Sequence, residues 1–226
     1  MELRYPWDTD PAPIETPSAL DAPPPKRRGR RPAAQTSAAA AEPPVWRYHH
    51  LTVSGPAESV ASFATAARGA GVIPWQLDVA RIEEDVFNLA AAEPAERRHL
   101  TIAGCRILAR QFRERVEVHH ARAVAQVGQS RACPLDLHAL LPVPPNVLAL
   151  GPIDPTALAW LAAHWGTTDR LRQVTERQGA TIPQPAGHST MGYGFFTAGE
   201  TPKAAFTAIG SRWSSLRFAL QLRSAD

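Results

Sequence analysis

Residues 160–174 read WLAAHWGTTDRLRQV, and residues 191–222 read MGYGFFTAGETPKAAFTAIGSRWSSLRFALQL. In the first stretch a helix is expected to end at the Trp-Gly-Thr turn. The second stretch predicts a strand over 193–198, a helix over 201–212 that Thr-Pro opens, and a strand over 216–222 in which Leu and Phe alternate with other residues. Strands and helices that follow one another in this order indicate an α+β domain.

The residues before this region continue the same pattern. The other predicted elements are strands over 51–53, 135–141 and 171–175, helices over 58–68 and 155–164, and a loop over 179–190. The helix over 155–164 has the clearest signals, because Asp154 suits its N-cap and Pro155 suits its first turn. The strand over 135–141 (LDLHALL) is predicted from its leucines and from the prolines that close it.

Residues 72–132 are interpreted as a helical insertion. They predict a short helix over 80–92 and a long helix that spans 95–127 at most, with apolar residues three or four positions apart. The opposite face of the long helix carries the arginines Arg106, Arg110, Arg113, Arg115 and Arg122. The solvated side of a packed helix is the preferred interpretation of this basic face, and contact with nucleic acid is the alternative.

The first 45 residues are expected to form a disordered tail, because they hold ten of the 22 prolines. Residues 1–21 are acidic, and a basic cluster follows them: Lys26, Arg27, Arg28, Gly29, Arg30, Arg31 and Pro32. The cluster resembles an AT-hook, whose core is Arg-Gly-Arg-Pro, with one extra arginine before the proline. Such an arm would place arginines in the narrow minor groove of duplex DNA. A solvated basic run that binds polyanions without preference is the alternative.

The composition sets further limits. The chain has 226 residues, of which 44% are hydrophobic, so residues 46–226 suffice for one folded domain with a core. No apolar run approaches the roughly 20 residues of a membrane span. The N-terminus lacks the basic-then-apolar pattern of a secretion signal, so a cytoplasmic protein is expected. The two cysteines, Cys105 and Cys133, are expected to be reduced.

Residues 192–195 (GYGF) resemble the third-strand signature of RNA-recognition motifs. With a period of two, Tyr193 and Phe195 would share one face of the sheet, where they could stack on bases. The basic position of that signature is Met191 here, and Thr52 stands where the first strand should supply an aromatic partner. A partly exposed aromatic strand without a ligand is therefore the preferred interpretation.

No catalytic residue, metal site or cofactor is assigned from the sequence. Residues 187–191 (GHSTM) lack the second glycine of a nucleophile elbow. Cys133 and His138 would point to opposite faces of the expected strand, and His119 and His120 are adjacent on a helix, so neither pair suits a metal ion. The glycines also lack the spacing of a phosphate-binding loop.

Three patches resemble the YubB-type ferredoxin-like domain family, which is found on plasmids and phages without assigned function. The patches are 46–55 (WRYHHLTVSG), 141–144 (LPVP), and 165–167 (WGT) with 196–198 (FTA), Pro202 and the last strand. The resemblance covers most of 46–71 and 135–223. It implies a ferredoxin-like antiparallel sheet with helices on one face, into which the insertion is placed. The family has asparagine where this chain has His49, and tryptophan where it has Asp169 and Gly199.

Three functions remain open at this point. The first is a non-enzymatic accessory protein of a mobile genetic element that contacts duplex DNA through residues 26–32. The second is a protein-interaction module that docks a partner or a second copy through the insertion helix. The third is a small-molecule enzyme with polar groups near Trp165, His164 and His138. The candidate binding surface within the domain consists of Trp165, Gly166, Thr167, Tyr193 and Phe195.

Overall fold

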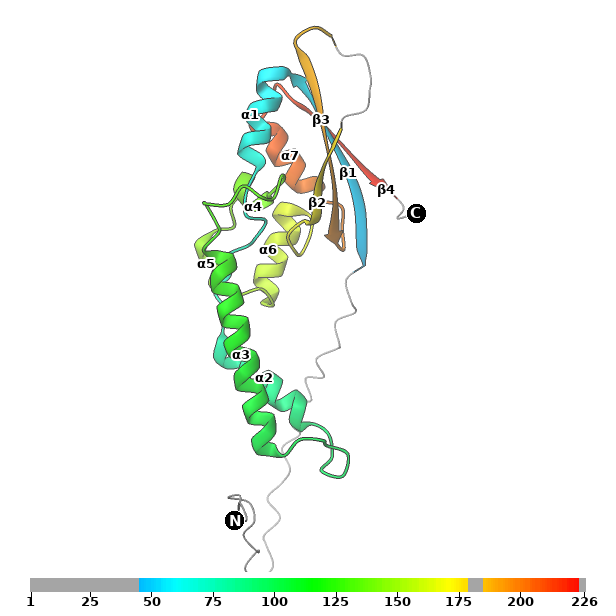
Figure 1. Cartoon of the computed structure of the whole chain (residues 1–226). Helices are drawn as coiled ribbons and strands as arrows, with labels where there is room; N and C mark the ends of the chain where they lie inside the picture. The colour runs from blue at the N-terminus through cyan, green and yellow to red at the C-terminus, as the bar shows by residue number, and fades with distance from the viewer. Residues whose placement is uncertain (1–44, 179–184, 224–226) are drawn as a thin grey trace, which may run out of the picture. The chain divides into compact units, whose positions relative to one another are not determined.

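The computed structural model describes residues 45–178 and 185–223. Its elements in chain order (Figure 1) are β1 (Trp46–Pro56), α1 (Ala57–Ala67), α2 (Val79–Ala91), α3 (Ile102–Val124), α4 (Leu137–Leu140), α5 (Pro145–Leu148), α6 (Pro155–Trp165), β2 (Arg172–Gln178), β3 (His188–Ala198), α7 (Lys203–Arg212) and β4 (Arg217–Arg223). The tail up to residue 44, with its basic cluster 26–32, lies outside the described residues. So do residues 179–184 of the expected loop.

The four strands form one antiparallel sheet in the order β2-β3-β1-β4. The central strand β1 pairs with β3 over its whole length and with β4 over residues 48–54. The strands predicted at 51–53 and 216–222 therefore lie side by side, and the prediction of an α+β fold is confirmed. β1 is longer than predicted, because aromatic, basic and polar residues at its ends hide the alternation.

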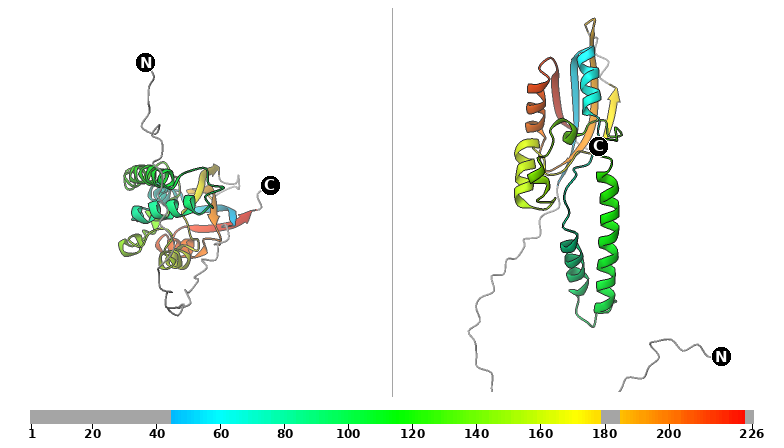
Figure 2. Two further views of the ribbon diagram at one scale, coloured as in Figure 1. Left: turned by 90° about the horizontal axis from the view of Figure 1, so that it is seen from below. Right: turned by 90° about the vertical axis from the view of Figure 1, so that its left-hand side faces the viewer.

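One face of the sheet carries the hydrophobic core. Odd-numbered residues of β1 and β3 point into it, among them Leu51, Val53, Tyr193 and Phe195, each no more than 1% exposed. Helices α1, α6 and α7 cover this face (Figures 1 and 2) and contribute the buried side chains Val60, Phe63, Ala67, Ala157, Leu161, Trp165, Ala205, Phe206 and Ile209. An apolar stripe on each helix thus meets alternate residues of the strands.

The strand predicted over 135–141 is wrong, because this segment contains the short helix α4. Asp136 caps the helix: its carboxylate accepts hydrogen bonds from the backbone N–H of His138 at 2.9 Å and from that of Gly71 at 2.8 Å. The two leucines of α4 are one helical turn apart, and both are buried. A short run rich in leucine suits a strand and a helical turn equally well, and here the capping carboxylate favours the helix.

Residues 79–124 form a helical hairpin, in which α2 and α3 lie side by side (Figure 2). Both helices are predicted from the sequence, but α3 begins later than expected. Thr101 caps it and accepts a hydrogen bond from the N–H of Gly104 at 3.0 Å. Two ion pairs join the helices, Arg106 with Glu84 at 2.7 Å and Arg113 with Glu83 at 3.0 Å.

The segment that contains the hairpin has its two ends joined. Gly69 and Cys133 form an isolated antiparallel bridge, with backbone N···O distances of 3.0 Å and 2.9 Å. Between this bridge and α2, Ile73 is buried in the core of the sheet domain. His120 Nε2 lies 2.7 Å from the carbonyl oxygen of Trp75 and ties α3 to the same connection.

Candidate functional site

The side chains predicted as a binding surface lie in the core instead. Trp165, Thr167, Tyr193 and Phe195 are each no more than 1% exposed. Odd-numbered residues of β3 face the helices, so the alternative in which Tyr193 and Phe195 stack on bases is wrong. The preferred interpretation, a partly exposed aromatic strand without a ligand, is also wrong for these two side chains.

The Trp-Gly-Thr turn has a structural role in this fold. Trp165 Nε1 donates to the carbonyl oxygen of Leu141 at 3.1 Å, and the Thr167 hydroxyl donates to that of Ala198 at 3.1 Å. Gly166 ends α6 in the left-handed conformation, with a φ of 74°. The turn therefore joins α6 to β3 and to the segment after α4.

The even-numbered residues of β1 and β3 lie on the opposite face of the sheet, away from α1, α6 and α7 (Figures 1 and 2). Tyr48 stands opposite Phe196, with ring centroids 4.8 Å apart, and its ring lies 5.1 Å from that of His50 in an edge-to-face arrangement. Trp46, at the start of β1, is on the same face and is 46% exposed. We call these four side chains the aromatic row.

A glycine on β3 makes room for this row. Gly194 stands opposite His50, and a Cβ atom at this position would collide with the hydroxyl oxygen of Tyr48. The Tyr48 side chain consequently reaches across β3 over bare backbone. Glycine in a strand often marks such a close approach.

Arginines border the aromatic row on both edge strands. The register of the sheet places four exposed arginines on this face: Arg172, Arg177, Arg217 and Arg223. Arg177 donates to the Tyr48 hydroxyl oxygen at 3.1 Å. Arg172 is partly neutralised, because it forms an ion pair with Asp169 at 2.6 Å. No carboxylate lies on this face among the strand residues within 45–178 and 185–223.

The pKa of His50 responds to this environment. Burial lowers it, and the guanidinium groups of Arg177 and Arg223 lower it further. The imidazole is therefore predominantly neutral at pH 7. The face thus combines uncharged rings with positive charge at their border, which suits recognition by stacking and by ionic attraction.

Two signals in the sequence could have revealed the aromatic row. Trp46, Tyr48 and His50 are two residues apart, as on one face of a strand, but the strand is predicted to begin only at residue 51. In the pair Phe195-Phe196, a shift of one residue exchanges the buried ring and the surface ring. The sequence did not indicate where β1 begins, or which alternate residues of β3 face the helices.

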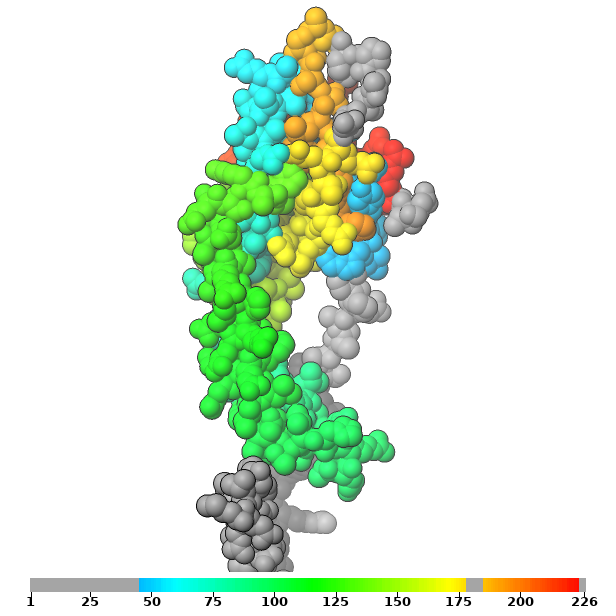
Figure 3. All heavy atoms as spheres, in the orientation of Figure 1, coloured from blue at the N-terminus to red at the C-terminus, as the bar shows by residue number. Residues whose placement is uncertain are grey.

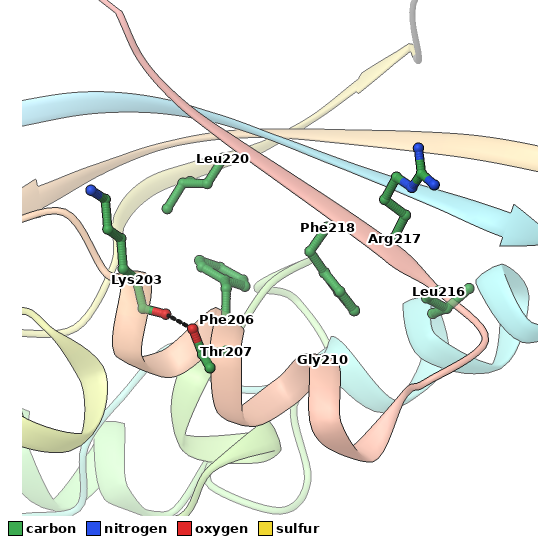
Figure 4. A pocket seen from close by; sticks show the side chains of 8 residues that line it. All are labelled: Lys203, Phe206, Thr207, Gly210, Leu216, Arg217, Phe218 and Leu220. Carbon is green, nitrogen blue, oxygen red and sulfur yellow. Dashed lines mark hydrogen bonds between the residues drawn. The ribbon is translucent and has the colours of Figure 1, made fainter.

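A groove of about 550 Å³ lies between α7 and β4 (Figure 4). Its lining consists of Lys203, Phe206, Thr207, Gly210, Leu216, Arg217, Phe218 and Leu220. The Thr207 hydroxyl is engaged, because it donates to the carbonyl oxygen of Lys203 at 2.9 Å. The ionisable side chains of this lining are Lys203 and Arg217, and neither a carboxylate nor a histidine accompanies them there as an acid–base partner.

The histidines named for an enzyme site have local partners. His138 Nδ1 accepts a hydrogen bond from the N–H of Val143 at 3.2 Å, and His164 stacks on Trp160 with centroids 4.2 Å apart.

Burial raises the pKa of the Cys133 thiol, which disfavours the metal-binding thiolate. In the described part of the chain, no group of three His, Cys, Asp or Glu residues could hold a metal ion.

His49 is a buried base on the core side of β1. The Thr197 hydroxyl donates to the carbonyl oxygen of Glu200 at 3.0 Å, so it accepts its 2.9 Å hydrogen bond from His49 Nε2–H. Nδ1 is buried without a partner in the described residues. Burial lowers the pKa of His49, and the charge of Arg47 lowers it further.

This arrangement predicts a loss of stability in mild acid. The unfolded chain, where the histidine pKa is about 6.5, takes up a proton at a higher pH than the folded chain. The contribution of neutral His49 to the free energy of unfolding is complete above the unfolded pKa and is lost as the pH falls below it. Urea unfolding between pH 7.5 and 5 should therefore show falling stability, with a shallower fall in His49→Gln, whose amide still donates to Thr197. Equal slopes would contradict the prediction.

Comparisons of the chain with protein-family models, with curated proteins and with solved structures find no significant match. None of the described helices is both long and apolar enough to cross a membrane.

Proposed function

We propose that this chain binds single-stranded nucleic acid on the open face of its sheet. The observation that supports the proposal is the aromatic row, bordered by arginines on both edge strands. Bases would stack on Tyr48 and Phe196 at the centre, and Trp46 and His50 would extend the row along β1. The arginines would attract the phosphates of the backbone.

The form of the nucleic acid follows from the chemistry of stacking. In a duplex the flat faces of the bases are covered by their neighbours, whereas a single strand can unstack and present them to aromatic side chains. Stacking tolerates every base, so little sequence preference is expected. The protein is therefore proposed to be a binding protein rather than an enzyme.

The basic cluster 26–32 joins this proposal as a second contact, to duplex DNA as its resemblance to an AT-hook implies. The chain between Pro32 and Trp46 extends over at most about 50 Å. A nucleic acid with a duplex part and an adjoining single-stranded part could thus be held by the arm and by the aromatic row together, and the two weak contacts would reinforce each other. The resemblance to the YubB-type family adds the proposed context, an accessory protein of a mobile genetic element.

The proposal includes a finer description of the fold, a ferredoxin-like sheet with a helical insertion. The strand order β2-β3-β1-β4 with antiparallel neighbours supports it, as do the helices between β1 and β2 and between β3 and β4. Such split β-α-β sheets leave one face free of helices. RNA-recognition domains bind on the corresponding face of a four-stranded sheet.

Fluorescence anisotropy tests the proposed function. A labelled 12-nucleotide single strand of uridine or thymidine is titrated with the full chain at low salt, and with Tyr48→Ala and Phe196→Ala. Each substitution should raise Kd by about 5- to 150-fold, since base–aromatic stacking contributes about 1–3 kcal/mol per base. Leu222→Ala is the matched control, because Leu222 is 53% exposed on β4 but stands opposite the core-side residue His49.

The outcomes separate the two contacts. An unchanged Kd in both aromatic variants would exclude the open face. If deletion of residues 1–44 then abolished binding, the basic arm alone would be the site. Substitution of Arg177 and Arg223 by alanine should reduce the dependence of Kd on salt, because fewer counterions are released from the strand.

A further inference from the structure

The strand β4 forms a regular free edge of the sheet. It is last in the order β2-β3-β1-β4, and within the described residues no strand pairs with its outer side. Its register with β1 is unbroken over 217–223. The other edge strand, β2, has a register shift between Arg172 and Thr175. A regular edge presents backbone N–H and C=O groups that can pair with a further strand. Figures 1 and 3 show β4 (red) at the border of the sheet.

The core-side face of β4 is only partly covered by the protein itself. Phe218, Leu220 and Leu222 point to this side, because they stand opposite the core-side residues of β1. Phe218 and Leu220 are half-buried against the core, and Leu222 is 53% exposed. The groove between α7 and β4 runs along this face, with Phe206 of α7 beside Leu220 and Phe218 (Figure 4). A strand added to β4 would lay alternate side chains over this apolar surface.

The charges along this edge are positive. Lys203 and Arg217 lie at opposite ends of the groove (Figure 4), and Arg223 ends the strand. Within the described residues, none of these three side chains forms an ion pair. Neither α7 nor β4 contains a carboxylate.

Three carboxylates lie near this edge along the chain or in space, and none is part of it. Glu58 belongs to α1, whose Ser59 Oγ is 3.2 Å from Oγ of Ser215, just before β4. Glu200 precedes α7 and does not line the groove. Asp226 follows β4 outside the described residues. The edge itself therefore combines an apolar side with uncompensated positive charge.

We propose that the outer edge of β4 binds an extended segment of another protein by strand addition. The segment would be apolar on the face that lies over the groove and acidic on the other face, where it passes Arg217 and Arg223. These arginines are six residues apart on one side of β4, so the acidic residues would also be six apart. Backbone hydrogen bonds would supply affinity, and the alternate side chains would supply selectivity.

The same arginines disfavour a second copy of this chain as the occupant. If two β4 strands paired antiparallel with full overlap, Leu220 would lie at the centre. Arg217 of one copy would then stand opposite Arg223 of the other at both ends. Like charges directly opposite each other destabilise a strand pair. Charge complementarity therefore favours an acidic partner.

Fluorescence anisotropy with the full chain and a labelled peptide of sequence SEVTVTVES tests the proposal. The peptide has valines on one face and, on the other, two glutamates six residues apart. It should bind with a Kd below about 1 mM. The matched peptide SKVTVTVKS should bind about 10-fold more weakly, because two attractive contacts become repulsive. No binding of the acidic peptide, or equal binding of both peptides, would overturn the proposal. The test contains no nucleic acid, so it succeeds or fails independently of the proposed function.

Substitutions in the chain locate the contact. Thr207→Glu and Leu222→Glu should each raise the Kd of the acidic peptide by about 10-fold or more, because each puts a carboxylate at the apolar surface. Ala208→Glu is the matched control, since Ala208 is exposed beside Thr207 on α7 but does not line the groove. Circular dichroism verifies that the variants remain folded. Equal effects of Thr207→Glu and Ala208→Glu would refute the groove as part of the site.

Charge reversal tests the role of the arginines. The double variant Arg217→Glu with Arg223→Glu should prefer the lysine peptide to the glutamate peptide. An unchanged preference would refute their role. In analytical ultracentrifugation of the chain alone, a dimer that Leu222→Glu disrupts would make a second copy the occupant and overturn the proposal.

Backbone methylation of the peptide tests strand addition itself. Alternate residues of an extended peptide direct their N–H groups to the same edge, so only one of the two alternate sets can pair with β4. Methylation of that set should abolish binding, whereas methylation of the other set should preserve it. Equal effects of the two methylated peptides would show that no strand is added.

Discussion

Replacement of Trp165 by alanine is expected to lower the free energy of unfolding by about 3–5 kcal/mol. Trp165 has the largest volume among the fully buried residues in the described part of the chain, and it belongs to the core between α6 and the sheet. Its removal leaves a cavity in place of the indole ring. It also deprives the carbonyl oxygen of Leu141 of the 3.1 Å hydrogen bond from Nε1.

Urea denaturation followed by far-ultraviolet circular dichroism measures this effect. The midpoint should fall while the slope stays constant, as a loss of stability requires. Trp46→Ala is the matched control, since Trp46 is 46% exposed and should change stability by less than about 0.5 kcal/mol. Trp165→Phe should recover part of the loss by filling the cavity without the hydrogen bond. A loss below 1 kcal/mol in Trp165→Ala, which is less than large core substitutions typically cost, would contradict the prediction.

The second large effect is expected at Asp136. Asp136 is only 7% exposed, and its carboxylate accepts hydrogen bonds at both oxygens, Oδ2 from the N–H of Gly71 and Oδ1 from that of His138. Hydrogen bonds to charged groups contribute about 1.5–3 kcal/mol each. Asp136→Ala should therefore cost about 3–5 kcal/mol, because two backbone donors lose their acceptor in a poorly solvated place.

Two further variants isolate the cause. Asp136→Asn keeps one oxygen acceptor and presents an amide to the other donor, so it should recover at most half of the loss. Asp154→Ala removes a carboxylate that also accepts two backbone hydrogen bonds, from Thr156 and Ala157, but Asp154 is less buried than Asp136. It should cost only about 1 kcal/mol. Equal losses at Asp136 and Asp154 would show that burial is not the cause.

The order of the elements could largely be predicted, because most elements have local signals. Asp154 and Pro155 mark the start of α6, and the spacing of apolar residues marks α3. The segment 135–141 is different. Its capping carboxylate is shared with Gly71, a residue far away in sequence, so the contact that favours a helix turn is a tertiary one.

The faces of the strands could not be predicted as well as their positions. Tyr193 and Phe195 were as plausible for the surface as Phe196, because β3 is rich in aromatic and glycine residues on both sides. The choice depends on which residues meet α1 and α7, and that information is non-local. The aromatic row likewise depends on the pairing of Tyr48 with Phe196 between distant strands. The basic arm 26–32 stays a prediction.

The bridge between Gly69 and Cys133 has a consequence for how chains of this architecture can vary. Two backbone hydrogen bonds close the neck of the segment, and just inside it Gly71 and Ile73 still contact the sheet domain, so the part of the segment that is free to vary begins after them. A longer, shorter or entirely different excursion could be accommodated at this neck while every strand keeps its neighbours. Natural variation or protein engineering could therefore replace the helical hairpin while the sheet domain keeps its fold.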